Sequence, residues 1–216
     1  MKRIYVLCEG QTEEGFINRV LAPFLWESGL YLKPIRVTAK LTATEKRSSG
    51  VSKYSKIRSD LVNLSKGDRG GFVTTMFDYY ALPKETPGIE NNDANVYRRI
   101  TAIESEIERD LGLPNCFVHL MLHEFEALLF TDPSKFAPYA SAKEIEAIQR
   151  VREKFDTPEH INRSKDTAPS KRLGAIIPKY AKITFGTLVA ERIGMPRILA
   201  ECKHFAAWVD KIRSLA

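Results

Sequence analysis

The chain has 216 residues, of which 44% are hydrophobic and 28% are charged, and its formal net charge at pH 7 is +6. This length suits one α/β domain, alone or with a helical extension, and the composition is that of a globular protein. No run approaches the ~20 apolar residues of a membrane span, and the first residues lack the long apolar region of a signal peptide. We therefore expect a cytoplasmic protein with no membrane contact.

The first predicted elements are a strand over residues 4–8, the turn Glu9-Gly10 and a helix over about 13–28. Thr12 is a plausible N-cap for this helix. Glu9 stands at the carboxyl end of the strand, where an open α/β sheet places its ligand site. A carboxylate there is suited to a hard cation such as Mg²⁺. The alternative is an ordinary strand-to-helix turn with surface acids.

The next stretch predicts a second strand over 30–38 and a long loop rich in Ser, Thr and Lys. A short helix then ends near Gly67, which we expect to be its C-cap. Residues 71–78 form the clearest buried strand of the sequence, and this strand also ends on a carboxylate, Asp78. After a further loop, a helix is predicted over 94–110 because its apolar residues fall on one face.

A fourth strand, over 116–122, ends at His123-Glu124-Phe125-Glu126, so three apolar strands finish on acids. Strands that alternate with helices predict a parallel sheet with right-handed crossovers, which brings the three acids to one edge. If the first and third strands are neighbours and the second lies outside the first, the strand order is 2-1-3-4 and the switch point lies between Glu9 and Asp78. Glu126 is a weaker candidate than Glu124, because it follows the apolar Phe125 and could pair with a nearby Lys or Arg. The alternative for both is that they cap and solvate a helix.

Beyond residue 132 the pattern is helical, with helices predicted over 144–155, 171–180, 184–193 and 203–215. The sequence therefore predicts an α/β core over residues 1–132. It also predicts a helical extension over 133–216 that packs on this core.

Positive charge gathers in two segments. Residues 40–70, which include Lys53 and Lys56, hold eight Lys and Arg against three acids, a net charge of +5. Residues 161–182 hold six against one acid, again a net charge of +5. Two basic segments on a mildly acidic body favour a phosphate-bearing partner such as nucleic acid. The alternative is solvated loops and helix faces.

Several other chemistries lack their motifs. His119 and His123 are four residues apart, but His119 falls in the predicted strand, and position 127 is not histidine, so zinc is disfavoured. The chain has no P-loop, no G-x-S-x-G and no G-x-G-x-x-G. Tyr79 and Tyr80 follow Asp78 directly, and we expect them to pack the loop beside the site, with a tyrosine nucleophile as the alternative.

The turn E-G-x-T-E and the acid after the third predicted strand resemble the TOPRIM fold of topoisomerases, primases and overcoming-lysogenization-defect nucleases. The resemblance extends along the chain through CEGQTEEGF, MFDYYALP, HEFEALLF, PEHIN, APSKRL and the late C-x-x-F-x-x-W. Together these motifs are similar to the bacterial domain-of-unknown-function family 4276. Some of its members are TOPRIM-like nuclease effectors of anti-phage defence, such as the nuclease partner of the PARIS system.

The resemblance implies that Glu9 is the TOPRIM glutamate and that Asp78 is the first acid of the family's D-x-D. Tyr80 stands where the second acid is expected, so Glu13 or Glu124 would complete a site for Mg²⁺ or Mn²⁺. The resemblance also makes Lys171 and Arg172 phosphate-contacting residues. The alternative for these two is a helix start with solvated charges.

The leading hypothesis is a Mg²⁺-dependent nuclease of DNA or RNA in a defence context, with Glu9, Asp78 and Glu124 as catalytic residues. The second is a catalytically silent module that docks on an ATPase partner, which the missing acid at Tyr80 favours. A weaker third is phosphotransfer on small nucleotides, and the basic segment 40–70 argues against it. A homodimer is left open.

Overall fold

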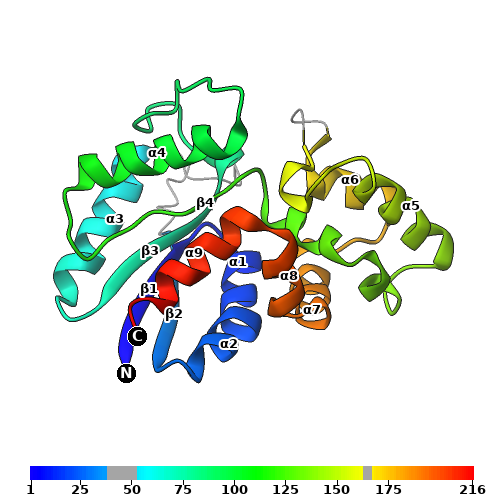
Figure 1. The fold of residues 1–216 in the computed structure, drawn as a ribbon, viewed down its shortest axis with the longest axis horizontal. Helices are drawn as coiled ribbons and strands as arrows, with labels where there is room; N and C mark the ends of the chain where they lie inside the picture. Colours follow the sequence, from blue (N-terminus) through cyan, green and yellow to red (C-terminus); the bar gives the residue numbers. More distant parts are fainter. Residues whose placement is uncertain (38–52, 163–166) are drawn as a thin grey trace, which may run out of the picture.

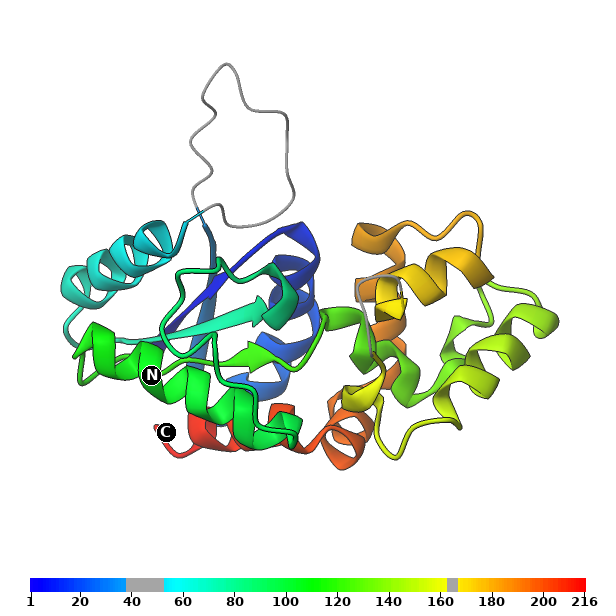
Figure 2. The same cartoon turned by 90° about the horizontal axis from the view of Figure 1, so that it is seen from above.

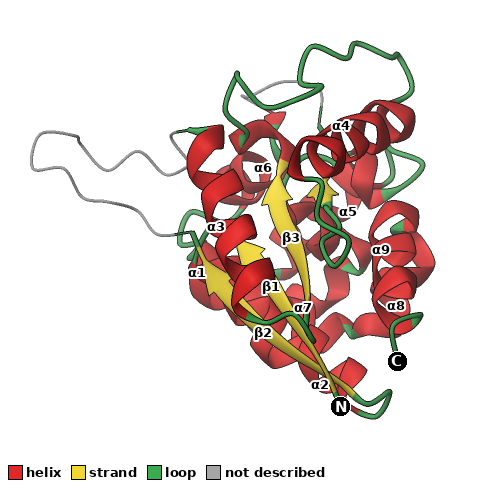
Figure 3. Cartoon of the chain, turned by 90° about the vertical axis from the view of Figure 1, so that its left-hand side faces the viewer, coloured by secondary structure: helices red, strands yellow, loops and turns green. Residues whose placement is uncertain are grey.

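The structure, a computed structural model, describes residues 1–37, 53–162 and 167–216. Its centre is a four-stranded sheet in the order β2-β1-β3-β4, which confirms the predicted parallel pairing and shows that the first and third strands are neighbours. The strands run in one direction (Figure 3). Their bounds are β1 (Lys2–Cys8), β2 (Leu30–Arg36), β3 (Phe72–Asp78) and β4 (Leu120–Met121). The loop predicted after β2 lies for the most part in 38–52, outside the described residues.

Helices cover both faces of the sheet in two layers (Figure 1), and alternate residues of β1 pack in different layers. Ile4, Val6 and Cys8 belong to a buried cluster with Phe16 of the first helical segment. Leu7 belongs to a second cluster, packed against α3 (Tyr54–Gly67) and α4 (Val96–Leu111). Burial on both faces explains why the central strands read as continuous apolar runs.

The fourth strand is much shorter than the predicted 116–122. Only Leu120–Met121 pair as a ladder, although Cys116 forms an isolated bridge to Val73. Between them, the hydroxyl of Thr75 donates to the carbonyl of His119 at 2.8 Å and accepts the N–H of the same residue at 2.9 Å. A side chain therefore takes over the bonds that a regular ladder would make.

The first predicted helix is present but interrupted. It comprises α1 (Gln11–Phe16), a π-helical turn η1 (Ile17–Leu21) and α2 (Ala22–Trp26). The π turn precedes Pro23, which has no N–H to donate to the carbonyl four residues back. The prediction of Thr12 as N-cap is wrong, because Gly10 is the N-cap and its N–H donates to Glu13 Oε2 at 3.0 Å.

The prediction of Gly67 as the C-cap of α3 is also wrong, because Gly67 is the last residue of this helix and Asp68 is the cap.

The second half of the described chain is helical, as predicted, and α8 is a helix that the sequence pattern missed. Its elements are η3 (Phe125–Thr131), η4 (Pro133–Phe136), α5 (Ala142–Arg152), η5 (Pro158–His160), α6 (Pro169–Ile176), α7 (Lys182–Ile193), α8 (Met195–Glu201) and α9 (Lys203–Arg213). Helices α5, α6 and α7 lie to one side of the sheet (Figure 2). Along 1–37, 53–162 and 167–216, no helix is long and apolar enough to cross a membrane.

Helix α9 returns to the sheet and packs on the same face as α1 (Figure 1). The indole Nε1–H of Trp208 donates to the hydroxyl of Thr74, in the middle of β3, at 2.9 Å. Phe205 packs against Phe16 with ring centroids 6.0 Å apart. The end of the chain therefore supplies part of the core that supports the central strands.

Candidate functional site

The three predicted acids stand at the carboxyl edge of the sheet. Glu9 follows β1, Asp78 is the last residue of β3, and Glu124 lies just beyond β4. Asp78 is 8% exposed, and Glu9 and Glu124 are partly buried. Glu13, in the first turn of α1, is 4% exposed and faces the same group. We define the acid group as these four residues together with Glu126.

Backbone N–H groups from different elements orient the acid group. Asp78 Oδ1 accepts the N–H of Phe125 at 3.0 Å, which ties the end of β3 to η3. Glu124 Oε2 accepts the N–H of Ser170 at 3.0 Å, in the first turn of α6. The motifs HEFEALLF and APSKRL, 46 residues apart at this bond, thus meet at one carboxylate. Each N–H fixes the orientation of the carboxylate it contacts.

Lys182, the first residue of α7, was not among the residues predicted for the site. Its ammonium lies 3.2 Å from Glu126 Oε2, and the Glu126 side chain is fully buried. The pairing of Glu126 with a nearby basic residue is therefore confirmed. Lys182 belongs to the basic segment 161–182, but no local pattern distinguished it from the other cations there.

Buried polar atoms without hydrogen bonds lie beside this ion pair. Within the described part of the chain, the Lys182 ammonium is the contact of Glu126 Oε2, whereas Glu126 Oε1 and the hydroxyl of Tyr180 have no hydrogen-bond partner. Burial, and then the charges of Glu126 and Glu124, raise the pKa of Tyr180. Such atoms cost free energy unless water or an ion satisfies them, so they can bond to a polar ligand.

Burial and mutual repulsion raise the pKa values of carboxylates in the acid group. Burial, followed by the charge of Glu13, raises the pKa of Glu9 to about 7, against the opposing effect of Lys182. Burial also raises the pKa of Glu126 to about 7. The pKa of Asp78 is raised well above its ordinary value by burial and then by Glu13. A cation would relieve this repulsion.

Lys182 remains protonated beside the carboxylates of the acid group. Burial favours the neutral amine, but Glu126, Asp78, Glu13 and Glu124 outweigh it and raise the pKa of Lys182. The ammonium is thus a fixed positive charge at neutral pH, and it is not a proton acceptor.

We expect Lys182→Met to destabilise the protein chiefly at high pH. A carboxyl group whose pKa is raised in the folded state stabilises that state less as the pH rises from its unfolded pKa to its folded pKa. Without the ammonium the folded pKa of Glu126 rises further, so the loss extends to higher pH. Breaking a buried pair costs about 3–5 kcal/mol, and we expect roughly 1–2 kcal/mol at pH 8 because the lysine side chain is 41% exposed.

Urea unfolding at pH 5 and pH 8 measures this effect. Lys179→Met is the matched control, because Lys179 is an exposed lysine just before α7. A loss of the same size at both pH values would contradict the electrostatic explanation.

The carboxylate oxygens of the acid group are suitable ligands for a divalent cation, but they do not surround one point on their own. Among residues 1–37, 53–162 and 167–216, three or more possible metal ligands lie within 4.8 Å of one another only at Glu104, His119 and His204. No three carboxylates of the acid group are therefore that close together. Mg²⁺ needs only one or two carboxylates when waters and substrate phosphate complete its shell. Tyr80 adds no carboxylate to the site. The residue is 45% exposed, and its ring stacks on that of His123.

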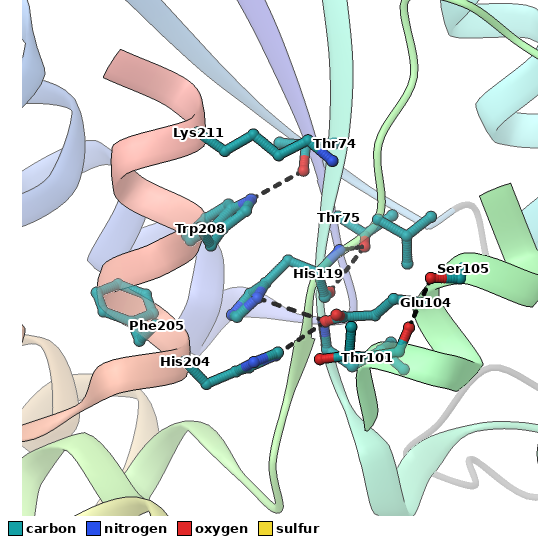
Figure 4. A network of polar contacts seen from close by, with 12 residues as sticks. Thr74, Thr75, Thr101, Glu104, Ser105, His119, His204, Phe205, Trp208 and Lys211 are labelled. Carbon is teal, nitrogen blue, oxygen red and sulfur yellow. Dashed lines mark hydrogen bonds and ion pairs between the residues drawn. The ribbon is translucent and has the colours of Figure 1, made fainter. Parts of the chain in front are cut away.

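The cluster of Glu104, His119 and His204 connects α4 and α9 to the segment before β4 (Figure 4). Glu104 Oε1 accepts the N–H of Leu120 at 2.8 Å and lies 2.9 Å from His204 Nε2. The ring of His119 stacks on that of Trp208, with centroids 4.5 Å apart and an interplanar angle of 9°. Burial lowers the pKa of His119, so its ring is neutral. Hydrogen bonds and stacking account for this arrangement as a structural network.

The predicted nucleic-acid-binding residues are spread over two helices. Lys171 is exposed in the first turn of α6, whereas Arg172 Nε donates to the carbonyl of Thr167 at 2.7 Å. Lys53 is exposed just before α3, and Lys56 pairs with Asp60. Because α3 connects two parallel strands, its first turn lies at the carboxyl edge of the sheet. Five further cations of the basic segments lie outside the described residues: Lys40, Lys46, Arg47, Arg163 and Lys165.

The fold and the site define an α/β protein whose parallel sheet carries buried and partly buried carboxylates, together with Lys182, at its carboxyl edge. The chain belongs to the family described as Domain of unknown function (DUF4276), whose model matches residues 8–213. Among curated proteins, none matches the sequence.

Two solved structures are similar to the chain at 14% sequence identity. One is the C-terminal region of the Burkholderia pseudomallei OLD protein, with a TM-score of 0.49, covering 98% of this chain and 97% of that one. The other is the C-terminal region of the Xanthomonas campestris pv. campestris OLD protein, with a TM-score of 0.37, covering 97% of this chain and 94% of that one.

Proposed function

We propose that the protein is a nuclease that hydrolyses phosphodiester bonds of DNA or RNA with Mg²⁺ or Mn²⁺. The observation that carries this proposal is the acid group, in which five buried or partly buried carboxylates face the ammonium of Lys182. Such an excess of carboxylate is costly for folding unless it serves to bind a cation. The resemblance of the Glu9 turn and of Asp78 to the TOPRIM motifs supports the same reaction.

Glu9, Asp78 and Glu124 would hold the ion, with Glu13 as a further ligand. A divalent cation supplies Lewis acidity toward phosphate oxygens and activates water. The N–H groups of Phe125 and Ser170 orient two of these carboxylates before any ligand arrives. Preorganised ligands lower the cost of assembling the site when substrate binds.

The chain's own cations would contribute electrostatic stabilisation. Lys182 stays protonated beside the acid group, so its ammonium can stabilise negative charge that develops on a phosphate in the site. Lys171 is exposed in the same turn of α6 whose Ser170 N–H contacts Glu124. Its position suits contact with the nucleic acid backbone next to the reacting phosphate.

The test is cleavage of plasmid DNA, single-stranded DNA and RNA with Mg²⁺ or Mn²⁺, comparing the wild type with Glu9→Gln. We expect the wild type to cleave at least one substrate and Glu9→Gln to be at least about 100-fold slower, since disturbing even the partners of metal ligands costs 10–100-fold. Glu27→Gln is the matched control, because Glu27 is exposed at the end of the first helix. Cleavage that survives in Glu9→Gln would rule out the assigned site.

A second candidate is a catalytically silent module that docks on an ATPase partner. The observation that favours it is the spacing of the acid group, together with Tyr80 in place of a second acid. If an ATP-binding-cassette-type ATPase is encoded in the neighbouring gene, gel filtration of the purified chain with that ATPase separates the two candidates. A stable complex, with no cleavage by the chain alone under any metal, would support the module.

A further inference from the structure

A polar groove of about 840 Å³ opens next to the acid group. Its lining combines both halves of the chain and includes Tyr80, Arg99, His123, Lys154, Phe155 and His160. Tyr80 is two residues beyond Asp78, and His123 directly precedes Glu124. The charges of both Arg99 and Glu124 act on the Tyr80 hydroxyl, so the groove and the acid group adjoin.

Aromatic rings form one wall of this groove. The rings of Tyr80 and His123 stack with centroids 5.4 Å apart and an interplanar angle of 16°. Tyr79 supports Tyr80 from a centroid distance of 5.6 Å. Although it is held in place by these neighbours, the Tyr80 side chain is 45% exposed. A supported, exposed aromatic ring is the surface on which unpaired nucleobases stack in single-strand-binding proteins.

The groove also offers positive charge and an unsatisfied polar atom. Arg99 donates through Nε and a terminal nitrogen to the carbonyl oxygen of Asp93, at 2.9 and 2.6 Å, which fixes the guanidinium without neutralising it. Lys154 is exposed, and so is Asp156, an acid in the lining. His123 is 8% exposed, and in the described parts of the chain its Nδ1 has no hydrogen-bond partner.

His123 contributes an imidazole nitrogen, Nδ1, that can hydrogen-bond to the edge of a base.

We propose that this groove binds one unstacked nucleotide of a single-stranded segment, with its base on Tyr80 and its phosphate near Arg99 and Lys154. The proposal rests on the proposed nuclease function and assigns it a substrate class, single-stranded or frayed nucleic acid. The bases of an intact duplex are stacked inside the helix and do not reach the Tyr80 ring. The volume lies within the 300–1,000 Å³ or so of small-ligand sites.

The experiment measures binding in EDTA, so that no cleavage takes place. Fluorescence anisotropy follows a fluorescein-labelled single-stranded oligonucleotide and a blunt duplex of the same sequence. For Tyr80→Ala we expect roughly tenfold weaker binding of the single strand and less than about twofold change for the duplex, and Tyr80→Phe should restore single-strand binding. Arg99→Gln should weaken single-strand binding and reduce the salt dependence by about one counterion.

Tyr31→Ala is the matched control, because Tyr31 is 42% exposed on β2 and does not line the groove. The proposal is overturned if Tyr80→Ala binds the single strand as the wild type does, if the duplex loses as much affinity, or if the folded wild type binds no single strand. A protein that binds single strands through Tyr80 and cleaves nothing would refute the nuclease alone. A protein that cleaves, but whose single-strand binding is unchanged by Tyr80→Ala, would refute the groove alone.

Discussion

Asp78→Asn is expected to reduce cleavage by at least about 100-fold while leaving the fold intact. Asparagine keeps the shape of the side chain, and its carbonyl oxygen can still accept the N–H of Phe125 that Asp78 accepts at 3.0 Å. What it removes is the negative charge that a cation would contact. The measurement is the rate of nucleic acid cleavage with Mg²⁺, alongside the thermal unfolding midpoint of the same preparation.

The same substitution should raise stability, and the gain should depend on pH. The pKa of Asp78 is raised above its ordinary 3.8 by burial and then by Glu13. The folded state therefore holds a proton that the unfolded state releases, and stability falls as the pH rises above that value. Asparagine does not titrate, so its advantage should be absent at low pH and should grow toward neutral pH.

Asp210→Asn is the control for this pair of measurements, since Asp210 is an exposed residue of α9. A variant at Asp78 that loses activity together with its cooperative unfolding transition would point to a structural role instead. Full activity in a folded Asp78→Asn would remove Asp78 from the proposed site.

Trp208→Ala should produce the largest loss of stability, about 3–5 kcal/mol, as is usual for a buried tryptophan. The side chain is 4% exposed, its indole donates to Thr74, and its ring stacks on His119. At roughly 2–4 °C per kcal/mol for a chain of this length, the unfolding midpoint should fall by on the order of 10 °C. Urea and thermal unfolding measure both quantities.

Trp26→Ala is the matched control, because Trp26 is 55% exposed and should change stability by less than about 0.5 kcal/mol. Trp208→Phe separates packing from hydrogen bonding. It retains much of the aromatic volume but leaves the Thr74 hydroxyl without its donor, at a cost of about 1–3 kcal/mol. If Trp208→Ala were as stable as Trp26→Ala, α9 would not belong to the core.

The sheet was predictable because its signals are local. Each central strand is an apolar run that ends at a polar residue, and the helices between the strands require parallel pairing. The length of β4 was not predictable in the same way. The bonds between Thr75 and His119 join residues 44 positions apart, and no local pattern reports that a hydroxyl will replace a ladder bond.

The acid group, like the sheet, was predictable from the sequence only in part. Glu9, Asp78 and Glu124 each follow an apolar strand, so the sequence by itself determined that they meet at one sheet edge. Only the tertiary structure decided that Lys182 is their counter-ion and that Ser170 orients Glu124, because both contacts depend on how the helical half folds back on the sheet. The distances among the carboxylates depend on the same packing, since backbone N–H groups from other elements orient Asp78 and Glu124, and the Lys182 ammonium contacts Glu126.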